Sequence, residues 1–241
     1  MTDHARSGLS IIHKTTLTPS KLELLTDWLP AQPWYLDRGR APDLAKAGGF
    51  RLDDPLGEVG IEFMVVTDGS DDQAVSYLAP MTYRASALAG ADGALIGTTE
   101  HGVLGRRWVY DGISDPVLVG QLVALIHGLA QAQMQSVNDT PDPTVTCVPV
   151  AIGTAVTIES ADVGNGPLGT ELRVGTVGED GSRGGRLVVT VNRVLQPDDA
   201  GLEHGPGGEA HRGRLSAGWR LADGTAVRGC LAVARHSHDG S

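Results

Sequence analysis

The chain has 241 residues, of which 41% are hydrophobic and 20% charged, a composition typical of a globular protein with a sizeable core. The formal net charge is −10, and no cluster of lysine and arginine exceeds a local pair or two. Because binding to duplex DNA requires a basic surface for the phosphates, we expect no nucleic-acid partner. The 33 glycines fall mostly in turns between short apolar runs, which favours a sheet-rich fold.

No apolar run approaches the ~18–20 residues that cross a bilayer, and the first ten residues, MTDHARSGLS, lack the apolar core of a signal peptide. The two cysteines, Cys147 and Cys230, are far apart in the sequence and show no CxxC spacing. This pattern favours reduced core or strand residues over a disulfide or a zinc site. We therefore expect a soluble, cytoplasmic protein with no membrane partner and no cofactor.

The first predicted helix covers residues 20–29. Ser20 and Glu23 have the spacing of a capping box, in which each side chain accepts a backbone N–H of the other residue. Leucines then recur at helical spacing, and Pro30 and Pro33 end the helix.

Antiparallel strands are predicted for the rest of this half. Asp-Gly pairs in the chain suit turns that demand positive φ. The predicted strands are 59–67, 75–83, 94–98 and 106–110, with a further first strand around 11–16.

A second helix is predicted from Asp115, which caps it, with Pro116 in its first turn. Its apolar face is formed by Val119, Leu122, Val123, Ile126 and Leu129. We expect it to run to about Gln135.

The second half of the chain shows no helical period. Its predicted strands are 144–158, 170–177, 186–195, 214–221 and 225–234. The Gly-rich stretch 198–213 is predicted to be a mobile loop.

Four stretches of the first half, in this order, resemble the N-terminal cap domain of actinobacterial maltokinases. They are TDWLPAQPWY (26–35), EVGIEFMVVTDG (58–69), ALIGTTEHG (94–102) and WVYDGISDPVLVGQLVALI (108–126). The resemblance covers roughly residues 10–135 and implies an α+β fold, a curved, cystatin-like antiparallel sheet with two main helices. We therefore predict a cap-like domain over 10–135, a linker over 136–144, an all-β domain over 145–235 and a disordered tail over 236–241.

The all-β domain resembles a degenerate kinase N-lobe. RLVVTVNRVLQPD (186–198) is similar to the kinase strand that carries the phosphate-pairing lysine and to the R-x-LQP continuation of maltokinases, but Thr190 holds the lysine position. GNGPLG (164–169) has GxGxxG spacing, and the strand-like sequence after it fails to match a dinucleotide-binding fold. A Gly-rich hairpin is the favoured interpretation. Without the lysine and without HRD or DFG motifs, we expect no productive ATP binding and no kinase activity.

The sequence identifies no confident catalytic residue. Glu100, His101, Arg106 and Arg107 form the most polar cluster near a turn, in which a histidine beside a carboxylate has the chemistry of an acid–base pair and the arginines that of an anion site. The favoured alternative is a solvated loop.

Trp28, Trp34 and Tyr35 place three of the ten aromatic side chains in one short stretch. Trp34 and Tyr35 lie beyond the periodic helical face and are candidates for stacking on a ligand or a partner. The favoured interpretation for both is core packing, and Trp28 is expected to be mostly buried.

Four histidines are scattered over the last part of the chain, namely His204, His211, His236 and His238. Only the last two lie close together, with no cysteine nearby, so we expect no metal site.

These observations predict a non-catalytic protein with a regulatory, scaffolding or binding role, linked to trehalose and α-glucan metabolism by the resemblance alone. The expected partner is another protein or a small sugar-like ligand. The alternative is a small enzyme or ligand-binding protein with a site in the cleft between the two domains. The sequence does not define the oligomeric state.

Overall fold

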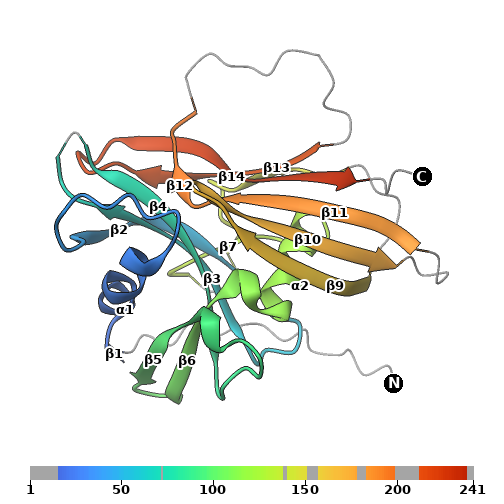
Figure 1. Cartoon of the computed structure of the whole chain (residues 1–241), viewed down its shortest axis with the longest axis horizontal. Coiled ribbons are helices and arrows are strands. Elements are labelled where there is room, and N and C mark those ends of the chain that lie inside the picture. The colour runs from blue at the N-terminus through green and yellow to red at the C-terminus, as the bar shows by residue number, and fades with distance from the viewer. Residues whose placement is uncertain are drawn as a thin grey trace.

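The computed structural model describes residues 16–71, 73–137, 140–150, 157–177, 183–198 and 212–237 (Figure 1). Within these ranges the chain forms a mostly antiparallel sheet with two short α-helices, which confirms a sheet-rich α+β fold. The predicted first strand at 11–16, the loop at 198–213 and the last four residues of the predicted tail lie almost entirely outside the described residues.

Helix α1 (Lys21–Trp28) begins as the sequence predicts. The Ser20 hydroxyl accepts the Glu23 N–H at 3.3 Å, and the Glu23 carboxylate accepts the Ser20 N–H at 2.7 Å. This reciprocal pair satisfies two of the backbone donors that a helix start leaves open. A 3-10 turn, η1 (Leu29–Ala31), follows directly.

Helix α2 (Pro116–Ile126) is capped by Asp115, but the prediction that it runs to about residue 135 is wrong. Gly128 adopts a positive φ of 73°, and the Leu129 N–H donates to the Ala124 carbonyl at 2.8 Å. A left-handed glycine with this 6→1 bond is a Schellman motif, which ends the helix. Leu129 is consequently exposed rather than part of the buried face. Among the described residues, no helix is both long enough and apolar enough to cross a membrane.

Fourteen strands are found in the described residues. The first seven are β1 (Leu17–Thr18), β2 (Leu44–Leu52), β3 (Gly60–Asp68), β4 (Val75–Arg84), β5 (Leu95–His101), β6 (Gly105–Asp111) and β7 (Gln133–Met134). The second seven are β8 (Thr146–Val148), β9 (Thr157–Asn165), β10 (Gly169–Val177), β11 (Arg183–Asn192), β12 (Val194–Leu195), β13 (Arg212–Arg220) and β14 (Ala226–Ser237). Their main order is β1-β5-β6-β4-β3-β2-β13-β14-β11-β10-β9.

The apolar strands β3, β4, β6, β10, β11, β13 and β14 follow the sequence prediction closely. β2 was not predicted. The extent of the single strand predicted over 144–158 is wrong, because β8 covers only Thr146–Val148 and β9 begins at Thr157 and runs on to Asn165. β2 contains the Gly48-Gly49 pair, and β9 reads TIESADVGN, so both lack the apolar alternation of a half-buried strand. β14 continues to Ser237, two residues into the predicted tail.

The strands of the two halves join at two places. β2 meets β13 where Gly48 lies opposite Trp219. β12 pairs with β4, with Val194 opposite Tyr77. Since only Arg193 separates β11 from β12, the pairings form a closed circuit: β4, β3, β2, β13, β14, β11 and, through β12, β4 again.

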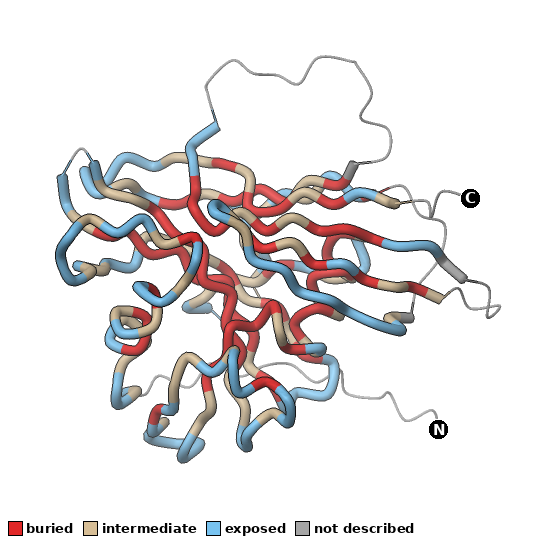
Figure 2. Tube along the Cα trace, viewed as in Figure 1, coloured by how far each residue is buried: buried red, intermediate tan, exposed pale blue. Residues whose placement is uncertain are grey.

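The main core is shared between the halves. It combines α2 with residues of β2 and β3 on one side and of β10, β11, β13 and β14 on the other. Figure 2 shows buried positions concentrated in the central strands. A second cluster lies under α1, on the opposite face of β3 and β4. The predicted domain boundaries remain a prediction. The structure shows in addition that residues of both halves contribute to one core.

Backbone hydrogen bonds connect the predicted linker, 136–144, to the residues that precede it. β7 pairs with β2, the Met134 N–H donates to the Thr140 carbonyl at 2.8 Å, and the Asp142 N–H donates to the Ala132 carbonyl at 2.9 Å. The chain therefore turns back on itself here and remains attached to the sheet.

Candidate functional site

The aromatic cluster belongs largely to the second core. Trp34 is completely buried, with its ring centre 5.7 Å from that of Trp28 and 6.0 Å from that of Tyr77. This placement leaves no face of Trp34 open to a ligand. Trp28, expected to be mostly buried, is of intermediate exposure and packs against this core from the end of α1.

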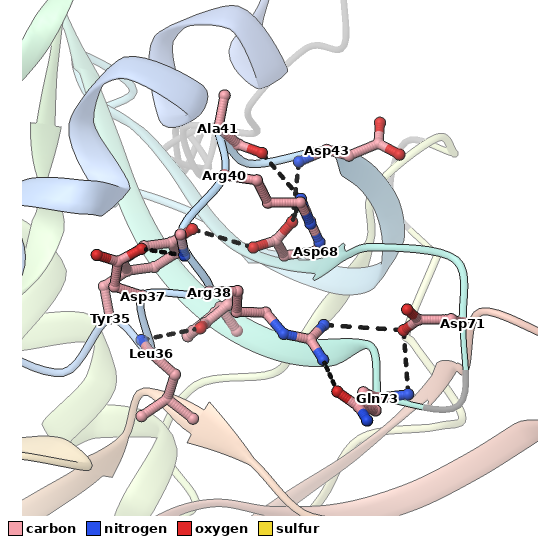
Figure 3. Close-up of polar contacts among 12 residues, drawn as sticks. Tyr35, Leu36, Asp37, Arg38, Arg40, Ala41, Asp43, Asp68, Asp71 and Gln73 are labelled. Atoms are coloured by element: carbon pink, nitrogen blue, oxygen red, sulfur yellow. Dashed lines mark hydrogen bonds and ion pairs between the residues drawn. The ribbon is translucent and has the colours of Figure 1, made fainter.

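Tyr35 is held by a buried carboxylate, that of Asp68 at the end of β3 (Figure 3). Asp68 accepts the Tyr35 hydroxyl at 3.1 Å, the Arg40 guanidinium at 2.9 Å and the Asp43 N–H at 2.8 Å. Burial, together with the Asp68 charge, raises the pKa of Tyr35 to about 12. The phenol is therefore neutral and serves to anchor the loop between η1 and β2.

Arg38 and the backbone of Leu36 make further contacts that hold this loop (Figure 3). Arg38 donates to the Gln73 side chain at 3.0 Å and lies 3.8 Å from the Asp71 carboxylate. The Leu36 N–H donates to the Tyr77 hydroxyl at 3.1 Å. Arg40 is thus paired with a buried carboxylate, whereas Arg38 donates to an amide and has only a longer contact with the exposed Asp71.

The polar cluster predicted from the sequence lies at the tip of the β5–β6 hairpin. Glu100 and Arg106 form an exposed ion pair at 2.8 Å. The His101 Nδ1 accepts the N–H groups of Val103 and Leu104 at 3.3 and 3.0 Å. Arg107, the fourth candidate, donates to the Leu104 carbonyl at 3.0 Å. The four residues are neighbours, but their contacts hold the turn, and Figure 1 shows the hairpin projecting away from the strands of the second half.

A buried carboxylate that the sequence analysis missed lies on β3. Glu62 accepts Lys21 at 2.6 Å, the Tyr83 hydroxyl at 2.7 Å and the Gln135 amide at 2.9 Å. Burial raises the pKa of Tyr83 well above its usual range, and the Glu62 charge adds to this effect. A charged residue inside the apolar run GIEFMVV was the available signal. With three donors satisfied, Glu62 ties α1 and the segment after α2 to the sheet.

The GxGxxG stretch forms the turn between β9 and β10, which confirms the predicted hairpin. The Gly166 N–H donates to the Gly169 carbonyl at 2.8 Å and closes the turn. Thr190, at the expected lysine position, lies on β11 opposite Glu171 of β10.

The described residues include neither a reactive cysteine nor a cluster of metal-binding side chains. Burial raises the pKa of Cys147 to about 11 and raises that of Cys230 as well, so both thiols are weak nucleophiles at neutral pH. No group of three or more His, Cys, Asp or Glu residues with metal-binding geometry occurs among the described residues. His236 lies in β14, whereas His204, His211 and His238 fall outside these ranges.

The junction of the two halves is centred on Arg193, which is completely buried. Its Nη2 lies 2.8 and 2.7 Å from the two carboxylate oxygens of Asp111, and its Nε donates to the Thr170 hydroxyl at 2.8 Å. The guanidinium also lies 5.1 Å from the ring centre of Trp34. Arg193 therefore joins β6, β10 and the aromatic cluster in one buried polar contact.

Three motifs quoted for the family resemblance meet in this contact. Trp34 belongs to QPWY, Asp111 to WVYDG and Arg193 to RVLQP. Since a buried charge is stable only when it is paired, these residues form a structural unit. The Arg193 guanidinium and the Asp111 carboxylate bind each other where the strand circuit closes, and the arginine is buried, so neither group is presented to a substrate.

An open cavity of about 400 Å³ lies elsewhere between the halves, between α2 and β9. It is lined by Pro116, Val119, Gly120, Val123, Ala124, His127 and Leu129 from the first half and by Ile158 and Ala161 from the second. We call it the α2–β9 groove. Its lining contains one titratable side chain and no carboxylate.

His127 lies at the end of this groove. Both ring nitrogens are buried without a hydrogen-bond partner among the described residues. Burial, and after it the proximity of His236, lowers the pKa of His127 below its ordinary value of 6.5. The imidazole is thus neutral at physiological pH and contributes to an apolar surface rather than a charged one.

Part of the chain matches a known protein family. Residues 28–115 match the family model of the maltokinase N-terminal cap domain, which confirms the resemblance for that part of the chain. No curated protein matches the chain. Fold and site together define a sheet-rich α+β protein in which residues 28–115 are similar to the maltokinase N-terminal cap domain and an apolar groove lies between the two halves.

Proposed function

We propose that this chain is a non-catalytic cap-domain protein that binds a protein partner and acts as a scaffold or regulator. The observation that carries the proposal is the α2–β9 groove, which is open, apolar and formed by both halves. Apolar concave surfaces of this kind favour burial of partner side chains.

Its setting in trehalose and α-glucan metabolism follows from the cap-domain match alone. A sugar is a poor fit for the groove itself, because sugars are held by carboxylates and amides that its lining lacks. The sugar-like ligand considered from the sequence is therefore less favoured than a polypeptide.

The second half, in this proposal, is a kinase N-lobe remnant without kinase activity. Support comes from the neighbouring antiparallel strands β9, β10 and β11 with the Gly-rich turn at 164–169. Thr190 offers no charge to a phosphate, and phosphoryl transfer depends on such charges. Isothermal titration with Mg-ATP and a coupled assay with maltose and other sugars should show neither binding nor turnover.

The alternative is a ligand-binding protein or small enzyme that uses the same groove. The observation in its favour is His127, whose two ring nitrogens lack partners among the described residues and could accept or donate to a small molecule.

Quantitative affinity capture with the full chain as bait, combined with native mass spectrometry of the purified protein, distinguishes the two. The proposal predicts stoichiometric recovery of a protein and no co-purifying metabolite. A tightly bound small molecule, or turnover of it that depends on His127, would favour the alternative.

A further inference from the structure

β9 forms one end of the strand order and pairs only with β10 among the described residues. Its positions from Glu159 to Asn165 are all exposed. An edge strand of this length presents a row of unpaired N–H and C=O groups, to which another strand can add.

One face of β9 continues into the α2–β9 groove. Ala161 lies opposite Val174 and Val163 opposite Leu172, and both of these β10 partners are completely buried. Ala161 and Val163 therefore point to the core side of the sheet, although Val163 is still 41% exposed. A strand added beside β9 would direct alternate side chains over α2, because side chains alternate between the faces of a sheet.

The helix side of the groove leaves room for those side chains. Gly120 lies in the middle of α2 and lines the cavity. A Cβ placed on it would meet no atom within 4 Å. The helix thus offers an open apolar floor at this point.

The negative charges of β9 indicate which kind of strand could bind beside it. Glu159 and Asp162 are exposed, and neither forms an ion pair with a described residue. A second copy of β9 would bring the same carboxylates together, and the net charge of −10 also opposes self-association. Basic residues on the added strand would complement them.

We propose that the α2–β9 groove receives an extended segment of another protein, which pairs with the edge of β9, places apolar side chains over α2 and presents lysine or arginine to Glu159 and Asp162. This proposal rests on the binding function proposed above and specifies its partner as a basic, alternating apolar strand.

The test uses the full chain and a displayed library of random peptides about twelve residues long, long enough to cover one strand. Recovered peptides are measured by fluorescence anisotropy against the parent, Gly120→Phe, Asp162→Lys and Gly93→Phe. Gly120→Phe fills the groove. Gly93 has equally open surroundings, lies in the 3-10 turn η2 (Asp92–Ala94) and is not part of the groove lining, so Gly93→Phe provides the matched control.

We expect peptides with alternating apolar and basic residues. Their affinity should fall about tenfold or more in Gly120→Phe and in Asp162→Lys, remain unchanged in Gly93→Phe, and weaken with salt. The β9 amides should gain protection from hydrogen exchange on binding.

Several results would overturn this inference. They are recovery of no peptide, binding that is insensitive to Gly120→Phe, peptides that match residues 1–15 of this chain, or a dimer of the chain that Gly120→Phe dissociates. A captured protein whose binding ignores Gly120→Phe would refute the groove as its site and leave the broader binding function standing.

Discussion

The two halves of the molecule meet in two contrasting ways. At the β4–β12 join, backbone pairing and the ion pair between Arg193 and Asp111 leave no accessible surface on the arginine. Between α2 and β9 no strand pairing occurs in the described residues, and an open groove remains. The first contact is polar and closed, and the second is apolar and open.

This difference separates what makes the fold from what is free to bind. The recognisable motif residues Trp34, Asp111 and Arg193 are buried in the closed contact. The groove residues come mainly from α2 and from the unremarkable sequence of β9. The buried motif residues therefore report the architecture. The groove combines α2, which lies in the quoted stretch 108–126, with Ile158 and Ala161, which lie in none of the quoted stretches.

Arg193→Met should have the largest effect on the closed contact. It leaves the Asp111 carboxylate buried without its cation, which typically destabilises a protein by about 3–5 kcal/mol. Chemical denaturation measures this loss. The exposed ion pair of Glu100 and Arg106 provides the control, since Arg106→Met should cost at most about 1 kcal/mol. Equal losses in the two variants would contradict a special role for the junction.

Trp34→Ala should also destabilise the junction, by about 3–5 kcal/mol, because it removes a large buried ring from beneath the guanidinium of Arg193. Trp28→Ala should cost clearly less, since Trp28 is only half-buried. Thermal and urea unfolding of both variants checks this ranking. A larger loss in Trp28→Ala would show that the aromatic cluster is packed differently.

Gly229→Ala probes the packing of β14 against the ring of Trp219, the β13 residue that lies opposite Gly48 of β2. A Cβ at Gly229 would overlap the Gln196 carbonyl oxygen and lie 2.7 Å from the Trp219 ring. Overpacking of this kind usually costs about 1–3 kcal/mol. Gly93→Ala, in open surroundings, should leave the unfolding midpoint almost unchanged. Tolerance of Gly229→Ala would mean that the surroundings of Trp219 are loosely packed.

The smallest effect concerns the open groove. Burial lowers the pKa of His127 in the folded state, so the unfolded chain binds a proton more readily as the pH falls below 6.5. Stability should therefore decrease with falling pH in this window, and His127→Gln should reduce the slope. Unfolding midpoints measured between about pH 7.5 and 5 test this. An unchanged slope would place His127 in a solvated environment.

Local features were predictable from the sequence because their signals are local. The capping box of Ser20 and Glu23 and the apolar strands β3, β4 and β10 follow from spacing alone. The end of α2 was missed, since the QAQMQ stretch reads as a good helix and the Schellman turn at Gly128 competes with it.

Long-range features could not be predicted in the same way. Arg193 and Asp111 are 82 residues apart, and nothing in either motif identifies the other as its partner. The groove arises only when the short sequence of β9 is placed beside α2. Of the candidate residues, the sequence grouped Glu100, His101, Arg106 and Arg107 correctly as neighbours, but it could not show that a turn uses their contacts.

The contrast between the closed and the open contact is tested most directly by amide hydrogen exchange of the free protein, resolved by mass spectrometry. Amides of β4 and β12 should exchange only through global unfolding, while those of β9 that face away from β10 should exchange rapidly. Equal protection of β9 and β12 would show that the groove edge is covered in the free protein. Independent exchange of β4 and β12 would show that the junction does not hold the two halves together, and either result would contradict the account.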